Sequence, residues 1–128
     1  MISLRKFFKS LKYALRGIKQ VMKQEHSFRV QLVAALVVLV VIFLLPLDVW
    51  EQVVLLLLVA AVLVLEVINS IFERLSDGLK PRLSDMVKDV KDMMAGAVLI
   101  TSCTAALIAA MILWPYLQDI AQLGKLFG

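Results

Sequence analysis

The amino-acid sequence predicts an all-α integral membrane protein: an N-terminal amphipathic surface helix followed by three transmembrane helices that associate as an oligomeric helix bundle. Hydrophobic residues make up 62% of the 128 residues, above the roughly 45–50% of soluble domains. A chain this short cannot bury so much apolar surface in its own interior, which excludes both a soluble globule and a disordered chain. The whole chain, residues 1–128, is interpreted as one membrane domain.

Three stretches are long enough to span a bilayer, which takes roughly 20 mostly apolar residues. We expect the spans at residues 28–47, 52–77 and 84–117, after a surface helix at residues 1–27. Lysine and arginine are concentrated before the first span and between the second and third, a bias typical of cytoplasmic segments. The N-terminus should therefore be cytoplasmic. The opposite interface should carry the aromatic residues Trp50, Trp114 and Tyr116.

The N-terminal segment has the pattern of a helix that lies in the membrane interface. Its apolar residues recur at spacings of three and four and form one stripe: Leu4, Phe7, Phe8, Leu11, Leu15, Ile18 and Met22. Six lysine and arginine side chains lie off this stripe. Tyr13 lies about 180° from it. Tyr13 could extend to the lipid headgroups or stack on a ligand ring, and the pattern leaves both open.

A polar stripe crosses the second span, formed by Glu66, Asn69, Ser70, Glu73 and Asp77. On a helix these residues fall within about 100° of arc, and Glu66 lies about 16 Å deeper than Asp77. A charged group at the bilayer centre costs at least about 2.5–3.5 kcal/mol, so the stripe should face other helices or a cavity. Asn69 and Ser70 could serve helix packing. Two carboxylates indicate a functional site instead.

Further charged residues should join this site at the cytoplasmic level. Glu25 precedes the first span and Asp92 precedes the apolar part of the third. One or two carboxylates together with phosphate oxygens suit Mg²⁺, and Lys91 would be a natural phosphate partner. The alternative is a solvated helix end with local ion pairs. Three spans enclose a polar stripe poorly, and the third span is rich in small residues that allow close helix packing, so we expect a homo-oligomer.

Several classes of site are excluded. One cysteine and one histidine leave no internal disulfide, no cysteine-based zinc site and no multi-histidine metal site. The sequence has no phosphate-binding G-x-x-x-x-G-K motif and no protein-kinase motif. Two functions remain from the residues alone: an Mg²⁺-dependent enzyme acting on a lipid, or a small transporter that carries protons or ions through Glu66. The charges cluster at one end of the spans, which favours the enzyme.

The run E-V-I-N-S-I-F-E-R-L-S-D from Glu66 to Asp77, followed by Lys91-Asp92 and by A-G-A-V from Ala95, resembles the signature of the prokaryotic diacylglycerol kinases. That family includes the undecaprenol kinases. The resemblance extends from Lys6 to Trp114. It implies a homotrimer of the bacterial inner membrane with sites shared between neighbouring chains. It also implies transfer of the ATP γ-phosphate to a lipid hydroxyl with Mg²⁺, and no nucleic-acid partner.

The resemblance also implies roles at matching positions. Glu66 matches the catalytic base near the lipid hydroxyl, and Asn69 matches an asparagine beside the reacting centre. Glu25 and Glu73 match the metal-binding carboxylates. The remaining positions match nucleotide contacts: Lys6, Tyr13, Asp77, Lys91 and Asp92.

Some positions depart from the pattern of the family, namely Ile71, Phe72, Ser84 and Gln31. Ser84 stands where some relatives have a nucleotide-contacting histidine. The choice between diacylglycerol and undecaprenol stays open, and so do a transporter and a non-catalytic assembly.

Overall fold

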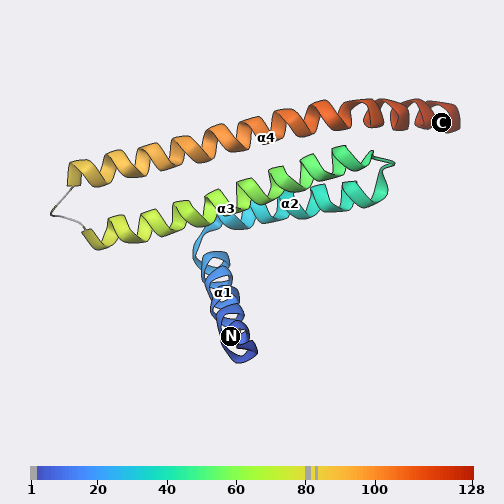
Figure 1. The fold of residues 1–128 in the computed structure, drawn as a ribbon. Helices are drawn as coiled ribbons and strands as arrows, with labels where there is room; N and C mark the ends of the chain where they lie inside the picture. Colours follow the sequence, from blue (N-terminus) through green and yellow to red (C-terminus); the bar gives the residue numbers. More distant parts are fainter. Residues whose placement is uncertain (1–2, 80–81, 83) are drawn as a thin grey trace.

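The computed structural model describes residues 3–79, 82 and 84–128. Over these residues the chain forms four α-helices, which are α1 (Leu4–Gln24), α2 (His26–Leu44), α3 (Val49–Leu79) and α4 (Ser84–Phe127). Helices α2, α3 and α4 run side by side, and α1 projects across their common direction (Figure 1). Each of these three long helices is apolar enough to cross a membrane. The all-helical prediction with three spans is confirmed.

The helices end at different residues from those expected. α3 begins at Val49 and ends at Leu79, so it extends past both ends of the expected 52–77 span. α4 continues to Phe127 through Pro115, beyond the expected end at residue 117. A proline cannot continue a helix, so the sequence predicts that Pro81 ends the second one, but Pro81 lies outside the described residues. Serine favours the N-cap position, which the sequence predicts at Ser84; the structure has Ser84 as the first residue of α4. For α3 and α4, hydropathy marks only the part of the helix inside lipid, which is shorter than the helix. α2 instead ends at Leu44, before the expected end at residue 47.

The surface helix α1 ends at Gln24 because the next residue, Glu25, does not have helical backbone angles. The backbone there is extended, with φ −111° and ψ 110°. The Glu25 N–H still donates to the Val21 carbonyl at 2.9 Å, and the Arg29 N–H donates to the Glu25 carbonyl at 3.3 Å. The break separates an amphipathic helix, which suits a flat interface, from the nearly continuous apolar run of α2, which suits the hydrocarbon. We call this junction the elbow.

α3 is the central helix, since it contacts each of the other three. A buried cluster of Ile42, Leu47, Leu55 and Ile112 joins α2, α3 and α4 at the end of the bundle where α2 connects to α3. Toward the middle of the bundle, Gln31 Nε2 donates to Ser102 Oγ at 3.2 Å and links α2 to α4. Beside it lies an apolar hollow of about 150 Å³. Much of the apolar surface of α4 faces outward, as expected for contact with lipid or with further copies of the chain.

A buried carboxylate, that of Glu51, links α3 to α4 at the end of the bundle where α3 begins. Glu51 is 7% exposed and accepts a hydrogen bond from the Tyr116 hydroxyl of α4. It also accepts one from the Asp48 backbone N–H at 3.0 Å. The sequence pattern assigned Tyr116 to the membrane interface but did not reveal this partner. The bond from Tyr116 links α4 to the start of α3, and the bond from Asp48 holds the same carboxylate at the N-terminus of α3.

Replacing Tyr116 with phenylalanine should lower the free energy of unfolding by about 1–3 kcal/mol, because a buried carboxylate loses a donor. Unfolding by SDS in mixed micelles measures the loss. The double variant Glu51→Met with Tyr116→Phe is the control, and it should be less destabilised than Tyr116→Phe alone because both polar partners are removed. Equal stability of Tyr116→Phe and the wild type would contradict the role given to this bond.

Candidate functional site

The polar stripe of α3 runs from a buried end to an exposed end. Glu66 is 3% exposed and Ser70 is 2% exposed. Asn69 and Glu73 are half-buried, and Asp77 is exposed. The Ser70 hydroxyl donates to the Glu66 carbonyl at 3.0 Å, so Ser70 is satisfied within its own helix. The burial follows the order of depth that the sequence predicted, with one carboxylate inside the helix bundle and the others toward water.

A side chain at the start of α2 donates a hydrogen bond to the most buried carboxylate of the stripe, that of Glu66. The Ser27 hydroxyl donates to Glu66 Oε2 at 3.1 Å. Ser27 is the second residue of α2 and lies two residues after the elbow. The Glu66 carboxylate therefore lies beside the elbow, at the junction between α1 and α2. Sequence reasoning missed Ser27, whose one signal was its position close to Glu25.

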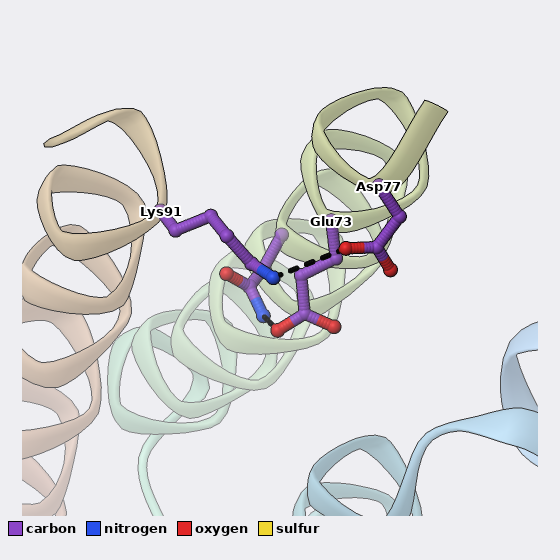
Figure 2. Close-up of polar contacts among 4 residues, drawn as sticks. Glu73, Asp77 and Lys91 are labelled. Atoms are coloured by element: carbon purple, nitrogen blue, oxygen red, sulfur yellow. Dashed lines mark hydrogen bonds and ion pairs between the residues drawn. The ribbon is translucent and has the colours of Figure 1, made fainter. Parts of the chain in front are cut away.

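A second polar group lies farther along α3, toward its C-terminal end. Asn69 Nδ2 donates to Glu73 Oε1 at 3.5 Å. Lys91 reaches across from α4 and pairs with Asp77 Oδ1 at 3.3 Å. Figure 2 shows the Lys91 side chain extending toward α3, with Glu73 and Asp77 on the same side of that helix. Residues from the predicted stripe and the predicted lysine are therefore brought together.

The elbow is braced by two arginines. The Arg29 guanidinium donates to the carbonyl oxygens of Met22 at 3.2 Å and Lys23 at 3.1 Å. These are carbonyls of the last turn of α1, which have no partner inside the helix. Arg74 of α3 donates to the Gln24 side chain. The half-buried Glu25 therefore sits at a junction that is tied both to α2 and to α3.

The contacts described above do not include the other predicted site residues, and Lys6 lies about 28 Å from the elbow along α1. Lys6 and Tyr13 are exposed on α1, and Asp92 is exposed on α4. Within residues 3–79, 82 and 84–128, no group of three or more histidine, cysteine, aspartate or glutamate side chains could hold a metal ion. Glu73 nevertheless has the right chemistry for one, because a carboxylate offers about four acceptor positions and is a preferred ligand of Mg²⁺. Among the described residues of the single chain, this carboxylate is not part of a cluster that would enclose an ion.

The family model for prokaryotic diacylglycerol kinase matches residues 12–113. The chain belongs to the prokaryotic diacylglycerol kinase family. The matched range contains the elbow, the whole polar stripe of α3, and Lys91 and Asp92 of α4, whereas Lys6 lies outside it. The resemblance predicted from the signature run is confirmed.

Two relatives show how far the similarity extends. The chain is 32% identical over 114 residues to the undecaprenol kinase of Bacillus subtilis (strain 168), which covers 89% of this chain and 93% of the relative. It is 28% identical over 111 residues to the diacylglycerol kinase of Escherichia coli (strain K12), which covers 87% and 91%. The protein is therefore a lipid kinase, and its family implies ATP and a lipid as substrates. Of the two functions that the sequence left open, family membership supports the kinase and not the transporter.

The elbow should loosen when Arg29 is replaced by glutamine. The carbonyls of Met22 and Lys23 lose their donor, at a net cost of about 1 kcal/mol. Amide hydrogen exchange in the last turn of α1 should therefore become about fivefold faster, as expected for local opening. Arg16→Gln, on the polar side of α1, serves as the matched control and should leave this exchange unchanged. Unchanged exchange in Arg29→Gln as well would show that Arg29 does not brace the elbow.

Proposed function

We propose that this lipid kinase uses Mg²⁺ and ATP to phosphorylate the hydroxyl of diacylglycerol or undecaprenol, with Glu66 as the general base. The observation that carries the proposal is the buried Glu66 carboxylate, which the Ser27 hydroxyl holds at the level of the elbow. A lipid alcohol has its hydroxyl at that level, where its chain enters the hydrocarbon. A carboxylate within hydrogen-bond distance of such a hydroxyl can accept its proton.

In the proposed reaction the lipid hydroxyl oxygen attacks the γ-phosphorus of ATP. The bond from that phosphorus to the bridging oxygen breaks, ADP leaves, and the hydroxyl proton passes to Glu66. Catalysis of phosphoryl transfer consists mostly of positioning and of neutralising charge on the phosphates. Ser27 orients the base, and Asn69 lies one turn farther along the same face of α3, beside the reacting centre.

Glu73 and Glu25 are the proposed Mg²⁺ ligands, together with phosphate oxygens. The ion would neutralise charge on the transferred phosphoryl group. Asn69 Nδ2 donates to Glu73 Oε1 at 3.5 Å, and this contact supports a role for Asn69 in holding the Glu73 carboxylate. Lys91, which pairs with Asp77 at 3.3 Å, is proposed to contact a phosphate. Asp77, Asp92, Tyr13 and Lys6 are proposed as further nucleotide contacts.

We further propose a homotrimer in the bacterial inner membrane, with the N-terminus and the site on the cytoplasmic side. The basic face of α1 and the basic residues between α3 and α4 support this orientation. The exposure of the site in a single chain supports completion by a neighbouring copy. The chain would then act as a single membrane kinase domain over residues 1–128.

The lipid substrate can be identified by offering diacylglycerol and undecaprenol side by side in mixed micelles with Mg²⁺ and labelled ATP. Phosphorylation of one lipid alone would name the substrate. Phosphorylation of both would mean that the site recognises the hydroxyl and its depth rather than the chain. Transfer to neither lipid by folded protein would contradict the proposed substrate class.

Replacement of Glu66 by glutamine should lower kcat by about 10²–10⁴-fold, the usual contribution of a general base, while the protein stays folded. Glu51→Gln is the matched control, because Glu51 is the other buried carboxylate of α3 and lies at the opposite end of the bundle. It should keep close to wild-type turnover. Wild-type turnover in Glu66→Gln would exclude this residue as the base.

Glu73→Gln should raise the Mg²⁺ concentration needed for half-maximal rate. Loss of a direct ligand should exceed the roughly 10–100-fold effect of removing a residue that only supports a ligand. Mg²⁺ titrations at saturating lipid measure the shift, and Glu25→Gln should act in the same direction. Asp119→Asn, on the far end of α4, should leave the titration unchanged. An unchanged Mg²⁺ requirement in Glu73→Gln would remove it from the metal site.

A further inference from the structure

The apolar hollow in the middle of the bundle is a groove with three sides. Its lining lies within residues 31–38 of α2, 55–62 of α3 and 102–109 of α4. The first and last lining residues are seven positions apart on each helix, so the groove is about 10 Å long. Both α2 and α4 pack against α3, whereas their described residues make no close backbone contact with each other. Helix α3 therefore forms the floor of the groove, and α2 and α4 form its walls.

The groove exists because its walls carry small side chains. Five of the eight lining residues of α2 and α4 are alanines, whereas the floor consists of leucine and valine. Its volume of about 150 Å³, spread over about 10 Å of length, gives a mean cross-section of about 15 Å². A helix, with a diameter of about 10–12 Å, is too wide to enter. A second copy of the chain could cover the groove, but its helices could not fill it.

One end of the groove leads to the proposed base. Val62 is the lining residue nearest to Glu66 on α3, and Gln31 is the one nearest to Ser27 on α2. Both separations are four residues, so the hydrogen-bonded pair of Ser27 and Glu66 lies about 6 Å beyond the groove, one helical turn along. The bond from Gln31 to Ser102 joins the two walls at this same end.

The other end of the groove is closed. Val38 of α2 and Ala109 of α4 line the groove and also pack against the buried cluster of Ile42, Leu47, Leu55 and Ile112. A chain that enters from the end near Glu66 therefore meets packed side chains after about 16 Å. The remainder of a longer chain has to leave sideways, between α2 and α4, where Ala34 and Ala106 are exposed.

We propose that this groove binds one hydrocarbon chain of the lipid substrate while the hydroxyl of that lipid lies at Glu66. The inference rests on the proposed role of Glu66 as the base. A lipid alcohol has its chain beside the reacting hydroxyl, and the groove begins one turn from Glu66 on both helices that position this carboxylate. Its occupant is therefore continuous with the reacting group. Of a lipid with two chains, the groove holds one and the other stays outside.

The groove contributes orientation more than affinity. Lipid tails are as apolar as the groove lining, so a chain gains little from leaving the bilayer. A chain held along α3 has a fixed direction, however, and its hydroxyl is then presented to Glu66 rather than sampling many positions. Such positioning is costly to lose, since a displacement of about 1 Å can lower the rate about 10²-fold.

Photolabelling tests where the chain lies. A diacylglycerol and a polyprenol each carry a diazirine about 10 Å from the hydroxyl, which is inside the length of the groove. A phosphatidylcholine with the same labelled acyl chain is the control, because it has no free hydroxyl. Each probe is irradiated with the full chain in mixed micelles, and mass spectrometry identifies the labelled residues. At least one alcohol should label residues 34–38 or 105–109 severalfold more than the phosphatidylcholine does.

Filling the groove is the second test. Ala106→Leu enlarges a wall residue, whereas the matched Ala110→Leu enlarges an exposed alanine one turn along α4 that does not line the groove. In Ala106→Leu the labelling of the groove should fall severalfold, and kcat/KM for the phosphorylated alcohol should fall about tenfold because the hydroxyl is displaced. Ala110→Leu should keep wild-type values. Unfolding of both variants by SDS shows whether they are folded.

Three results would overturn the groove as a substrate site. Equal labelling by phosphatidylcholine would mean that any lipid chain enters it. Labelling of other residues alone would place the substrate chain elsewhere or mean that protein fills the groove. Wild-type labelling and kcat/KM in folded Ala106→Leu would show that the substrate does not use this space. None of these results touches the proposed base, which the turnover of Glu66→Gln tests. Turnover of neither alcohol by the wild-type chain would instead remove the proposed function, and this inference with it.

Discussion

The arrangement at the site depends on one buried carboxylate. A carboxyl side chain in an apolar helix loses its hydration, and its burial is tolerated only where hydrogen bonds to the protein replace those to water. Glu66 obtains its donor from Ser27 of α2, so the start of α2 must lie beside the middle of α3. That requirement sets the register between α2 and α3. It also places the elbow beside Glu66 rather than farther along α3.

The elbow follows from a change of chemistry along the chain. α1 has one apolar stripe and many cations, whereas α2 is apolar on nearly all sides. Two such helices cannot share one axis without placing charge in lipid or apolar surface in water. The chain resolves this with a single extended residue, Glu25, without glycine or proline. Arg29 and Arg74 satisfy polar groups of the last turn of α1, so the direction of the break is held.

The proposed kinase mechanism depends on two carboxylates that lie at different heights along α3. Glu66 and Glu73 are seven residues apart on α3, which corresponds to about 10 Å along the helix. In the proposed mechanism the lipid reaches the deeper carboxylate, and the nucleotide reaches the shallower one from water, together with Asp77 and Lys91. Because a lipid alcohol and a nucleotide approach from opposite phases, a helix that crosses the boundary between them can bind both. The single chain leaves this region open, which fits a site shared between copies.

The sequence by itself determined the features that follow from periodicity and hydropathy. The apolar stripe of α1, the three spans and the polar stripe from Glu66 to Asp77 are properties of residues close together in the chain, and the signature run identified the family. Only the tertiary structure decided the pairs Ser27–Glu66, Glu51–Tyr116, Gln31–Ser102 and Asp77–Lys91, since each joins residues 14 to 71 positions apart. Such pairs depend on which helix faces pack and in what register. The extent of α4 beyond residue 117 was also decided there, because backbone hydrogen bonds continue a helix past the point where hydropathy falls.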